Sequence, residues 1–341
     1  MSASHGRATT VGSLRPRPLN PRQLTSYLGN ARDLPELLSL QQRHGDDFNG
    51  FHIGAFWSKF KSLAHGRLGG LSDRLTPVCE QTARMLPELD ARAVANVVHA
   101  FAKAELVGAG PWESVWAALP EAVRRRLDGF NPQDLSNTAW AFATAGHASP
   151  ELFNVISAEA LRRRLSGFDE QDLCNIAWAF AVFNPSCADE LFGSTIFVTR
   201  CARLDPSFSR PCLAQLHQWS IWCDEHGTTW PRLPESLQQA CRDAFTAQEA
   251  TLSQLQSDVV REIRSRGARV KEEHRCEASG YSIDALVTLN DGERVAVEVD
   301  GPSHFIGRSH QPTGATLLKH RQLRYFGWRL ESVPYWEWDR S

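Results

Sequence analysis

Acidic side chains and a histidine are concentrated in one short stretch near the C-terminal end of the chain, VAVEVDGPSHF. Glu298 and Asp300 lie two residues apart in a strand-like pattern, so both side chains should point to the same face. Asp284, on a preceding predicted strand, can face them across a hairpin. Three converging carboxylates are costly unless they are solvated, protonated or bound to a divalent cation. His304 follows a Gly-Pro turn and could act as a general base or as a further ligand.

These four residues leave two interpretations open. In the first, Asp284, Glu298 and Asp300 bind Mg²⁺ or Mn²⁺ and, with His304, form the catalytic site of a nuclease that activates water. In the second, they are the remains of such a site in a domain that only binds, and the protein needs no cofactor. We favour the binding interpretation.

A small α/β unit is expected to position these residues. The strands YSIDALVTLN and RVAVEVD flank Asp291-Gly292, which is a hairpin signal. ATLLKHRQLRYFG is typical of a helix that ends at a glycine, and WRLESVPYW of a final strand. The predicted helix carries three basic residues that could contact RNA: Lys319, Arg321 and Arg324.

The middle of the chain contains an internal repeat. FNPQDLSNTAWAFATAG begins at Phe130, FDEQDLCNIAWAFAVFN at Phe168, and LDARAVANVVHAFAKAE at Leu89. A period near 40 residues is typical of an α-solenoid of helical hairpins. Within each copy, apolar residues such as Leu135, Ala139 and Phe142 fall on one helix face. The sequence therefore predicts residues 33–229 as a helical repeat domain, residues 230–267 as a connecting helical segment, and residues 268–341 as the α/β domain.

Two arginine triplets occur at equivalent points of successive repeats, in EAVRRRLDGF and EALRRRLSGF. Equivalent positions stack in a solenoid, so the triplets could form one basic stripe that binds a phosphate backbone. Alternatively, they are arginines at helix C-termini that offset the helix dipole and remain solvated. The six residues are Arg124, Arg125, Arg126, Arg162, Arg163 and Arg164.

Asn137, Asn175, Trp140 and Trp178 could read or stack on bases. We favour a packing role, in which the tryptophans fill the interhelical core and the asparagines bond one repeat to the next.

Bulk composition narrows the possibilities. The net charge of −2 excludes a globally basic nucleic-acid coat, and no apolar run is long enough to predict a membrane span. The eight cysteines form no C-x-x-C pair and suggest buried thiols in a reducing compartment. Residues 1–32 contain arginines and no acidic residue, which is typical of a mitochondrial or plastid transit peptide or of a disordered basic tail.

The segment IDALV…VAVEVDGPSHF…LLKHRQLRYFGWRLESVPYWEW resembles a RAP domain, an RNA-binding module. The repeats resemble those that precede RAP domains in octotricopeptide-repeat proteins and in the mitochondrial Fas-activated serine/threonine kinase family. RAP domains are in turn similar to the PD-(D/E)xK restriction-endonuclease-like fold. In that motif Asp284 would be the first acid and Glu298 the second, but Asp300 stands where the lysine is expected. His304 or Lys319 could replace that lysine.

The resemblance implies an organellar RNA-binding protein, in the mitochondrial matrix or a plastid, that acts in RNA processing, transcript stability or translation. Its expected partners are organellar mRNA or rRNA and other RNA-processing proteins, with no membrane. The alternatives are a metal-dependent endoribonuclease and a protein-binding scaffold of an RNA-processing complex.

Overall fold

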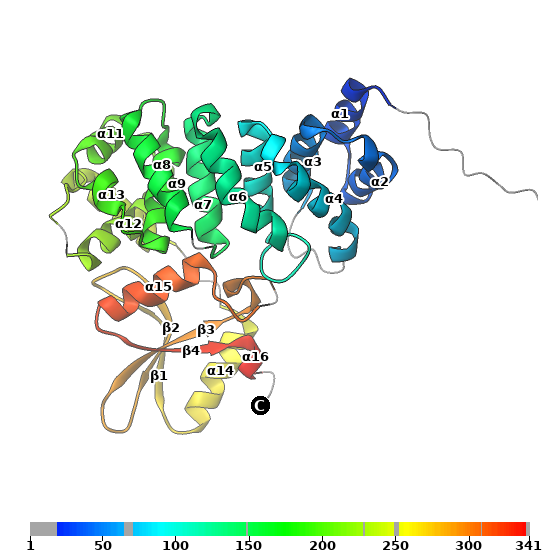
Figure 1. The fold of residues 1–341 in the computed structure, drawn as a ribbon. Coiled ribbons are helices and arrows are strands. Elements are labelled where there is room, and N and C mark those ends of the chain that lie inside the picture. The colour runs from blue at the N-terminus through cyan, green and yellow to red at the C-terminus, as the bar shows by residue number, and fades with distance from the viewer. Residues whose placement is uncertain are drawn as a thin grey trace, which may run out of the picture.

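The computed structural model describes residues 19–64, 71–147, 149–227, 229–248, 252–307 and 309–338 of the chain. Helices fill the first part of the chain, as the repeat pattern predicts (Figure 1). Their bounds are α1 (Pro21–Asn30), α2 (Leu34–His44), α3 (Gly50–Leu63), α4 (Ser72–Met85), α5 (Ala91–Lys103), α6 (Glu113–Arg126), α7 (Pro132–Thr144), α8 (Pro150–Arg162), α9 (Glu170–Phe183), α10 (Ala188–Phe192), α11 (Ile196–Leu204), α12 (Arg210–Glu225) and α13 (Glu235–Thr246).

Each repeat begins its first helix with the same local device. Asp90, Asn131 and Asp169 are N-cap residues whose side chains accept a hydrogen bond from the backbone N–H three residues later. In α7 and α9 the backbone N–H of the N-cap residue donates in turn to the side chain of Asp134 or Asp172, which completes a capping box. These caps fix where each repeat starts and therefore keep the repeats in register.

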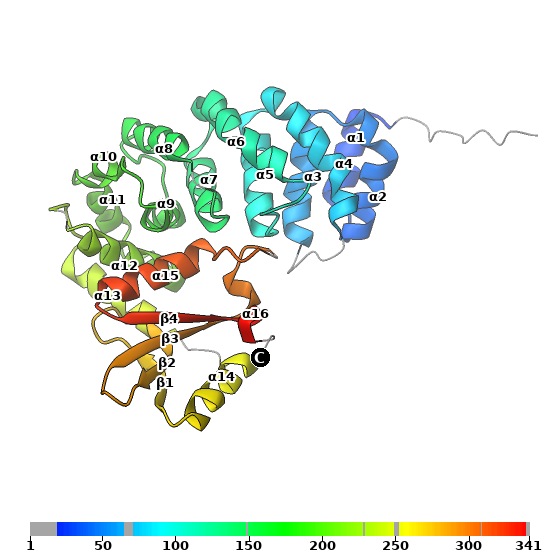
Figure 2. The same cartoon turned by 60° about the horizontal axis from the view of Figure 1, so that its bottom comes forward.

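The helices form two layers. α3, α5, α7, α9 and α12 pack side by side in one row, which we call the inner row, and α4, α6, α8 and α10 pack in a second row behind it (Figure 2). The apolar face predicted for α7 is buried, since Leu135, Ala139 and Phe142 are at most 1% exposed. The α-solenoid prediction is confirmed, and all eight cysteines are free and buried.

The folded region starts before the boundary predicted at residue 33. α1 packs against α3, and its side chains Leu24 and Leu28 are buried in the same core as the repeats. Residues 1–18, which hold most of the predicted transit peptide or tail, lie outside the described residues.

A mixed four-stranded sheet forms the C-terminal domain, in the order β1-β2-β3-β4. β1 pairs antiparallel with β2, β2 antiparallel with β3, and β3 parallel with β4 after a crossover through α15. The bounds are α14 (Gln254–Ser265), β1 (Arg269–Arg275), β2 (Ser282–Thr288), β3 (Arg294–Asp300), α15 (Gly314–Tyr325), β4 (Arg329–Pro334) and α16 (Tyr335–Trp338). Val259 and Val260 of α14 pack on one face of the sheet, while Leu323 of α15 packs on the other.

The predicted connecting segment, residues 230–267, divides between the two domains. α13 packs on α12 and extends the solenoid, whereas α14 packs on β1 and β3. The final strand also ends earlier than WRLESVPYW suggests, because the chain turns into the short helix α16 after Pro334.

α15 joins the two domains into one body. It lies against α7, α9 and α12, and its Leu318 belongs to the hydrophobic core of the solenoid (Figures 1 and 2). Gly314, at the first turn of α15, comes so close to α7 that a Cβ there would lie 2.3 Å from the Ala143 carbonyl oxygen. The C-terminal domain is thus held against the inner row of helices.

Candidate functional site

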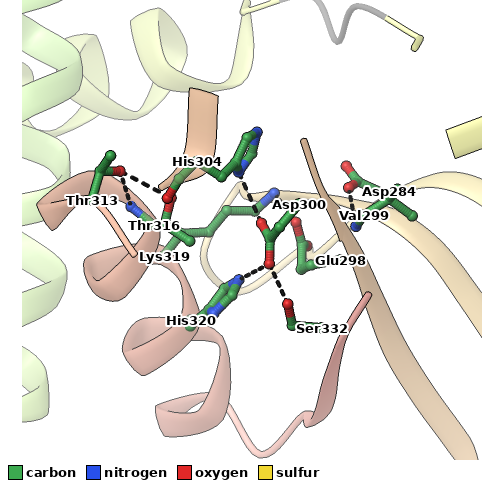
Figure 3. A network of polar contacts seen from close by, with 10 residues as sticks. All are labelled: Asp284, Glu298, Val299, Asp300, His304, Thr313, Thr316, Lys319, His320 and Ser332. Carbon is green, nitrogen blue, oxygen red and sulfur yellow. Dashed lines mark hydrogen bonds and ion pairs between the residues drawn. The ribbon is translucent and has the colours of Figure 1, made fainter. Parts of the chain in front are cut away.

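The carboxylates of the C-terminal domain lie on neighbouring strands. Ala285 of β2 pairs with Val297 of β3, so Asp284 and Glu298 are adjacent across the hairpin, as predicted. The Asp284 Oδ2 atom accepts a hydrogen bond of 2.8 Å from the Val299 backbone N–H. Glu298 is fully buried and forms an ion pair with Lys319, which reaches down from α15 (Figure 3).

Asp300 belongs to a separate set of contacts. Its Oδ1 atom lies 2.8 Å from the His304 Nδ1 atom, and its Oδ2 atom accepts a hydrogen bond from Ser332 and lies 3.4 Å from the His320 Nε2 atom (Figure 3). Burial alone would raise the pKa of Asp300, but the hydrogen bonds from His304 and Ser332 outweigh it and hold the pKa below its ordinary value.

Lys319 supplies the positive charge nearest to Asp284 and Glu298. Burial raises the pKa of Glu298 to about 8, although the attraction of Lys319 opposes the rise. Burial also raises the pKa of Asp284, again against the pull of Lys319. For Lys319, burial disfavours the charged form, but the two carboxylates more than compensate and raise its pKa. An ammonium group therefore sits beside the carboxylates and offsets part of their negative charge.

The residues do not fit a three-carboxylate metal centre. Over the described part of the chain, no three His, Cys, Asp or Glu side chains are grouped so that they could hold a metal ion. Asp300 is turned to His304, His320 and Ser332, and Glu298 is closed off from solvent by its pairing with Lys319. Of the two replacements considered for the missing lysine, Lys319 is the one that contacts Glu298.

A cavity of about 350 Å³ opens beside this cluster. Asp284, His304 and Lys319 line it from the C-terminal domain, together with Arg275 at the end of β1. Its other wall belongs to the solenoid, through residues of α12 and α13 that include Gln218 and Phe245. We call this the interdomain cavity. Neither domain alone would form it.

The arginine triplets do not form the free basic stripe that the repeat alignment suggests. Arg124 and Arg125 pair with Glu121 at 2.8 and 2.6 Å, and Arg162 and Arg163 both pair with Glu159 at 2.6 Å. The acids stand three and four residues before the arginines on the same helix, a spacing that brings side chains together. The stripe hypothesis missed these acids because it considered the triplets alone.

Sequence reasoning also missed a ladder of arginine-to-carbonyl hydrogen bonds. Arg126 donates to the Leu89 oxygen at 2.9 Å, Arg163 to the Phe130 oxygen at 2.6 Å, and Arg200 to the Phe168 oxygen at 2.7 Å. Each accepting carbonyl belongs to the residue just before the N-cap of an inner helix. These arginines therefore tie the end of each repeat to the start of its own first helix, and the RRRL-x-GF motif that contains Arg126 and Arg163 was the signal for this role.

The basic residues of α15 have different environments. Lys319 is paired with Glu298, and Arg324 is exposed. Arg321 pairs with Glu225 of α12 at 2.7 Å and donates to the carbonyls of Ala181 and Val182 at the end of α9. Arg321 therefore fastens the two domains together.

The asparagines and tryptophans of the repeats largely follow the packing interpretation. Asn175 donates a 3.2 Å hydrogen bond to Asn137 in the preceding repeat, and Trp178 is buried in the core. Trp140 is half-buried and instead lines a second cavity, of about 550 Å³, on the inner row of helices.

Comparison with known proteins agrees with the C-terminal resemblance. Residues 297–340 match the family model of the RAP domain. A protein of rice (Oryza sativa subsp. japonica) named "RAP domain-containing protein, chloroplastic" is 35% identical over 107 residues, which are 31% of this chain and 16% of the rice protein. The chain thus spans about a sixth of the length of that relative. None of the described helices is long and apolar enough to span a bilayer. The chain is therefore a helical-repeat protein that carries a RAP domain at its C-terminal end.

Proposed function

We propose that the protein binds RNA in a plastid and acts in the maturation, stability or translation of an organellar mRNA or rRNA. The RAP domain supports the RNA ligand, and the chloroplastic name of the rice relative supports the plastid over the mitochondrial matrix. The observation that carries the proposal is the fixed position of the RAP domain. Through α15 it packs on the inner row, so that RAP and repeat residues line one cavity together.

A role in binding agrees with the chemistry of the acidic cluster. Glu298 is fully buried and pairs with Lys319 through Oε2, and Asp300 is 1% exposed and contacts His304, His320 and Ser332, so the charges of both are compensated inside the domain and away from the surface. Such a network stabilises the domain and orients α15 against β3. Binding without cleavage is therefore the outcome that we expect.

The test is a binding titration of the full chain with labelled single-stranded RNA, double-stranded RNA and single-stranded DNA over a range of KCl concentrations. Neutralisation of phosphates by basic side chains should make the logarithm of affinity fall linearly with the logarithm of salt concentration. We expect tighter binding to single-stranded RNA than to the other two ligands. Absence of any salt-dependent binding to RNA would remove the proposal.

Endonucleolytic cleavage is a second candidate, because Asp284, His304 and Lys319 all open onto the interdomain cavity. The same RNA incubated with Mg²⁺ or Mn²⁺ tests this candidate against the variant Asp284→Asn. The amide can still accept the hydrogen bond from the Val299 N–H, so the variant should keep its fold. Cleavage by the wild-type protein that the variant loses would establish the nuclease. Equal activity, or none, would exclude it.

A further inference from the structure

We propose that the second cavity, on the inner row of helices, binds the unpaired bases of single-stranded RNA, and that Lys61, Arg92 and Lys103 hold the adjoining phosphates. We call the cavity the amide groove and the three basic residues the cation cluster. The inference rests on the proposed RNA-binding function and gives it a site. It also moves the expected phosphate contacts from the arginine triplets to a different surface.

Amide side chains dominate the lining of the groove, and all of them except Gln248 come from three consecutive inner helices. Among the described residues that line it, none is an aspartate, glutamate, lysine or arginine. Amides offer both donors and acceptors, which suits the edges of unpaired bases better than it suits phosphates. The lining amides of these three helices are those of Gln133, Asn137, Gln171, Asn175, Gln215 and Gln218.

Hydrogen bonds within α9 and between α9 and α7 hold part of this set in place. The Gln171 amide donates to the Asn175 oxygen at 2.9 Å, and the Asn175 amide donates to the Asn137 oxygen at 3.2 Å. Such fixed side chains lose little conformational freedom on binding, which favours recognition of a ligand.

One lining atom lacks a partner. The Gln215 Oε1 atom is buried and has no hydrogen-bond donor among the residues that the structure describes. A buried acceptor without a donor is unfavourable, so a ligand that offers an N–H group at this point would relieve the cost. The exocyclic amino groups of adenine, cytosine and guanine and the ring N3–H of uracil are donors of this kind.

An aromatic surface lies at the α5 end of the groove. Trp140 and His99 both line the groove, with their ring centroids 6.0 Å apart and their planes at 79°. Both side chains are half-buried, which leaves ring surface accessible to a base. Burial lowers the pKa of His99 to about 4, with help from Lys61 and Lys103, so the ring is neutral near pH 7.

The cation cluster adjoins this end. Lys61 of α3 donates a 3.1 Å hydrogen bond to Asn96, one helical turn before His99, and its charge and that of Lys103 act on His99. Arg92 and Lys103 are exposed on α5. Lys61 and Arg92 also face Asp134, whose pKa burial raises despite both of them. These cations are placed to bind the backbone of a strand whose bases enter the groove.

The opposite end of the groove leads to the RAP domain. The groove and the interdomain cavity share three lining residues, Gln218, Phe245 and Gln248. Arg275 lines the interdomain cavity just beyond them. A strand that follows the groove would therefore run from the cation cluster over uncharged amides to the RAP domain.

The proposal separates base contacts from phosphate contacts, and three variants test the separation. A cation variant combines Lys61→Gln, Arg92→Gln and Lys103→Gln. A groove variant is Gln215→Ala. It removes the Oε1 atom, which accepts no hydrogen bond within the described residues, so the substitution breaks no hydrogen bond of that oxygen. A control variant, Arg124→Gln with Arg125→Gln, removes positive charge from the triplet side. Affinities of the full chains for labelled A, C, G and U homopolymers are measured by fluorescence anisotropy at several KCl concentrations, after circular dichroism has shown that each variant is folded.

The cation variant should weaken binding to every homopolymer by a similar factor and reduce the salt slope by about 2, since each phosphate contact on a single strand contributes about 0.7. The groove variant should weaken binding to at least one of the four homopolymers by roughly tenfold while the salt slope stays the same. The control variant should keep the wild-type slope. Loss of slope in the control but not in the cation variant would overturn the phosphate assignment.

Unchanged affinity of the groove variant for all four homopolymers would overturn the base assignment and would leave the groove to a ligand other than RNA. Failure of the wild-type protein to bind any RNA would instead contradict the proposed function itself. The two failures are therefore distinguishable in one set of measurements.

Discussion

Arg321→Ala should loosen the RAP domain from the solenoid. The substitution leaves the Glu225 carboxylate, whose side chain is 18% exposed, and the carbonyls of Ala181 and Val182 without their donor. The second Glu225 oxygen is already buried and has no hydrogen-bond partner among the described residues. The substitution would therefore leave the carboxylate without the donor that Arg321 provides. Removing one member of a fully buried ion pair costs about 3–5 kcal/mol. Because Arg321 itself is 29% exposed, we expect a smaller loss, about 2–3 kcal/mol.

Native-state hydrogen exchange measures this loss where it should occur. A loss of that size should accelerate exchange of the α15 amides by roughly 30- to 150-fold, since every 1.4 kcal/mol is a factor of ten. Amides of α5, far from the interface, should exchange as in the wild type. Arg324→Ala is the matched control, because Arg324 is exposed on the same helix and its loss should change stability by at most about 0.5 kcal/mol.

A second substitution tests the reason for the effect. Glu225→Gln in the Arg321→Ala background removes the unpaired charge and should restore part of the lost protection. If α15 exchanges at the wild-type rate in Arg321→Ala, or no faster than in Arg324→Ala, the reasoning that Arg321 fastens the domains is refuted.

Three further predictions concern stability. Lys319→Met should lower the free energy of unfolding by about 1–3 kcal/mol near pH 7, because it removes the hydrogen-bond donor of the buried Glu298, whose raised pKa lets the carboxyl group take up a proton, and the double variant with Glu298→Gln should lose less in urea titrations; equal losses would contradict the pairing argument. Gly314→Ala should cost about 1–3 kcal/mol in thermal melts because its Cβ would meet the Ala143 carbonyl, whereas Gly29→Ala, with nothing within 4 Å, should be neutral or stabilising; a neutral Gly314→Ala would disprove the close approach. Burial raises the pKa of Asp172 from 3.8 to about 6, so the native state keeps a proton that the unfolded state has released and stability falls as pH rises between these values. Asp172→Asn should remove up to about 3 kcal/mol of that fall in urea titrations at several pH values, and an unchanged pH dependence would show that Asp172 has no part in it.

Part of the acidic cluster could be predicted from the sequence. The period-two alternation of β3 and the Asp291-Gly292 turn correctly placed Asp284 beside Glu298 on adjacent strands. The partners of Asp300 were not predicted, because His320 and Ser332 come from α15 and β4, which fold against β3 only through the parallel crossover. β1 was not predicted as a strand, since its sequence RVKEEHR is mostly charged and half-exposed.

The chain by itself determined the repeat register, because the N-caps Asp90, Asn131 and Asp169 and the apolar face behind them act within a single helix turn or hairpin. Local pattern likewise determined the β2–β3 hairpin. Only the tertiary structure decided which charges are free. Arg163 finds the Phe130 carbonyl at the start of its repeat and Arg321 finds carbonyls of α9 and an acid of α12, whereas Arg92 and Lys103 stay exposed beside the amide groove. Charge is a property of the residue, but its availability depends on neighbours that packing brings from distant parts of the sequence.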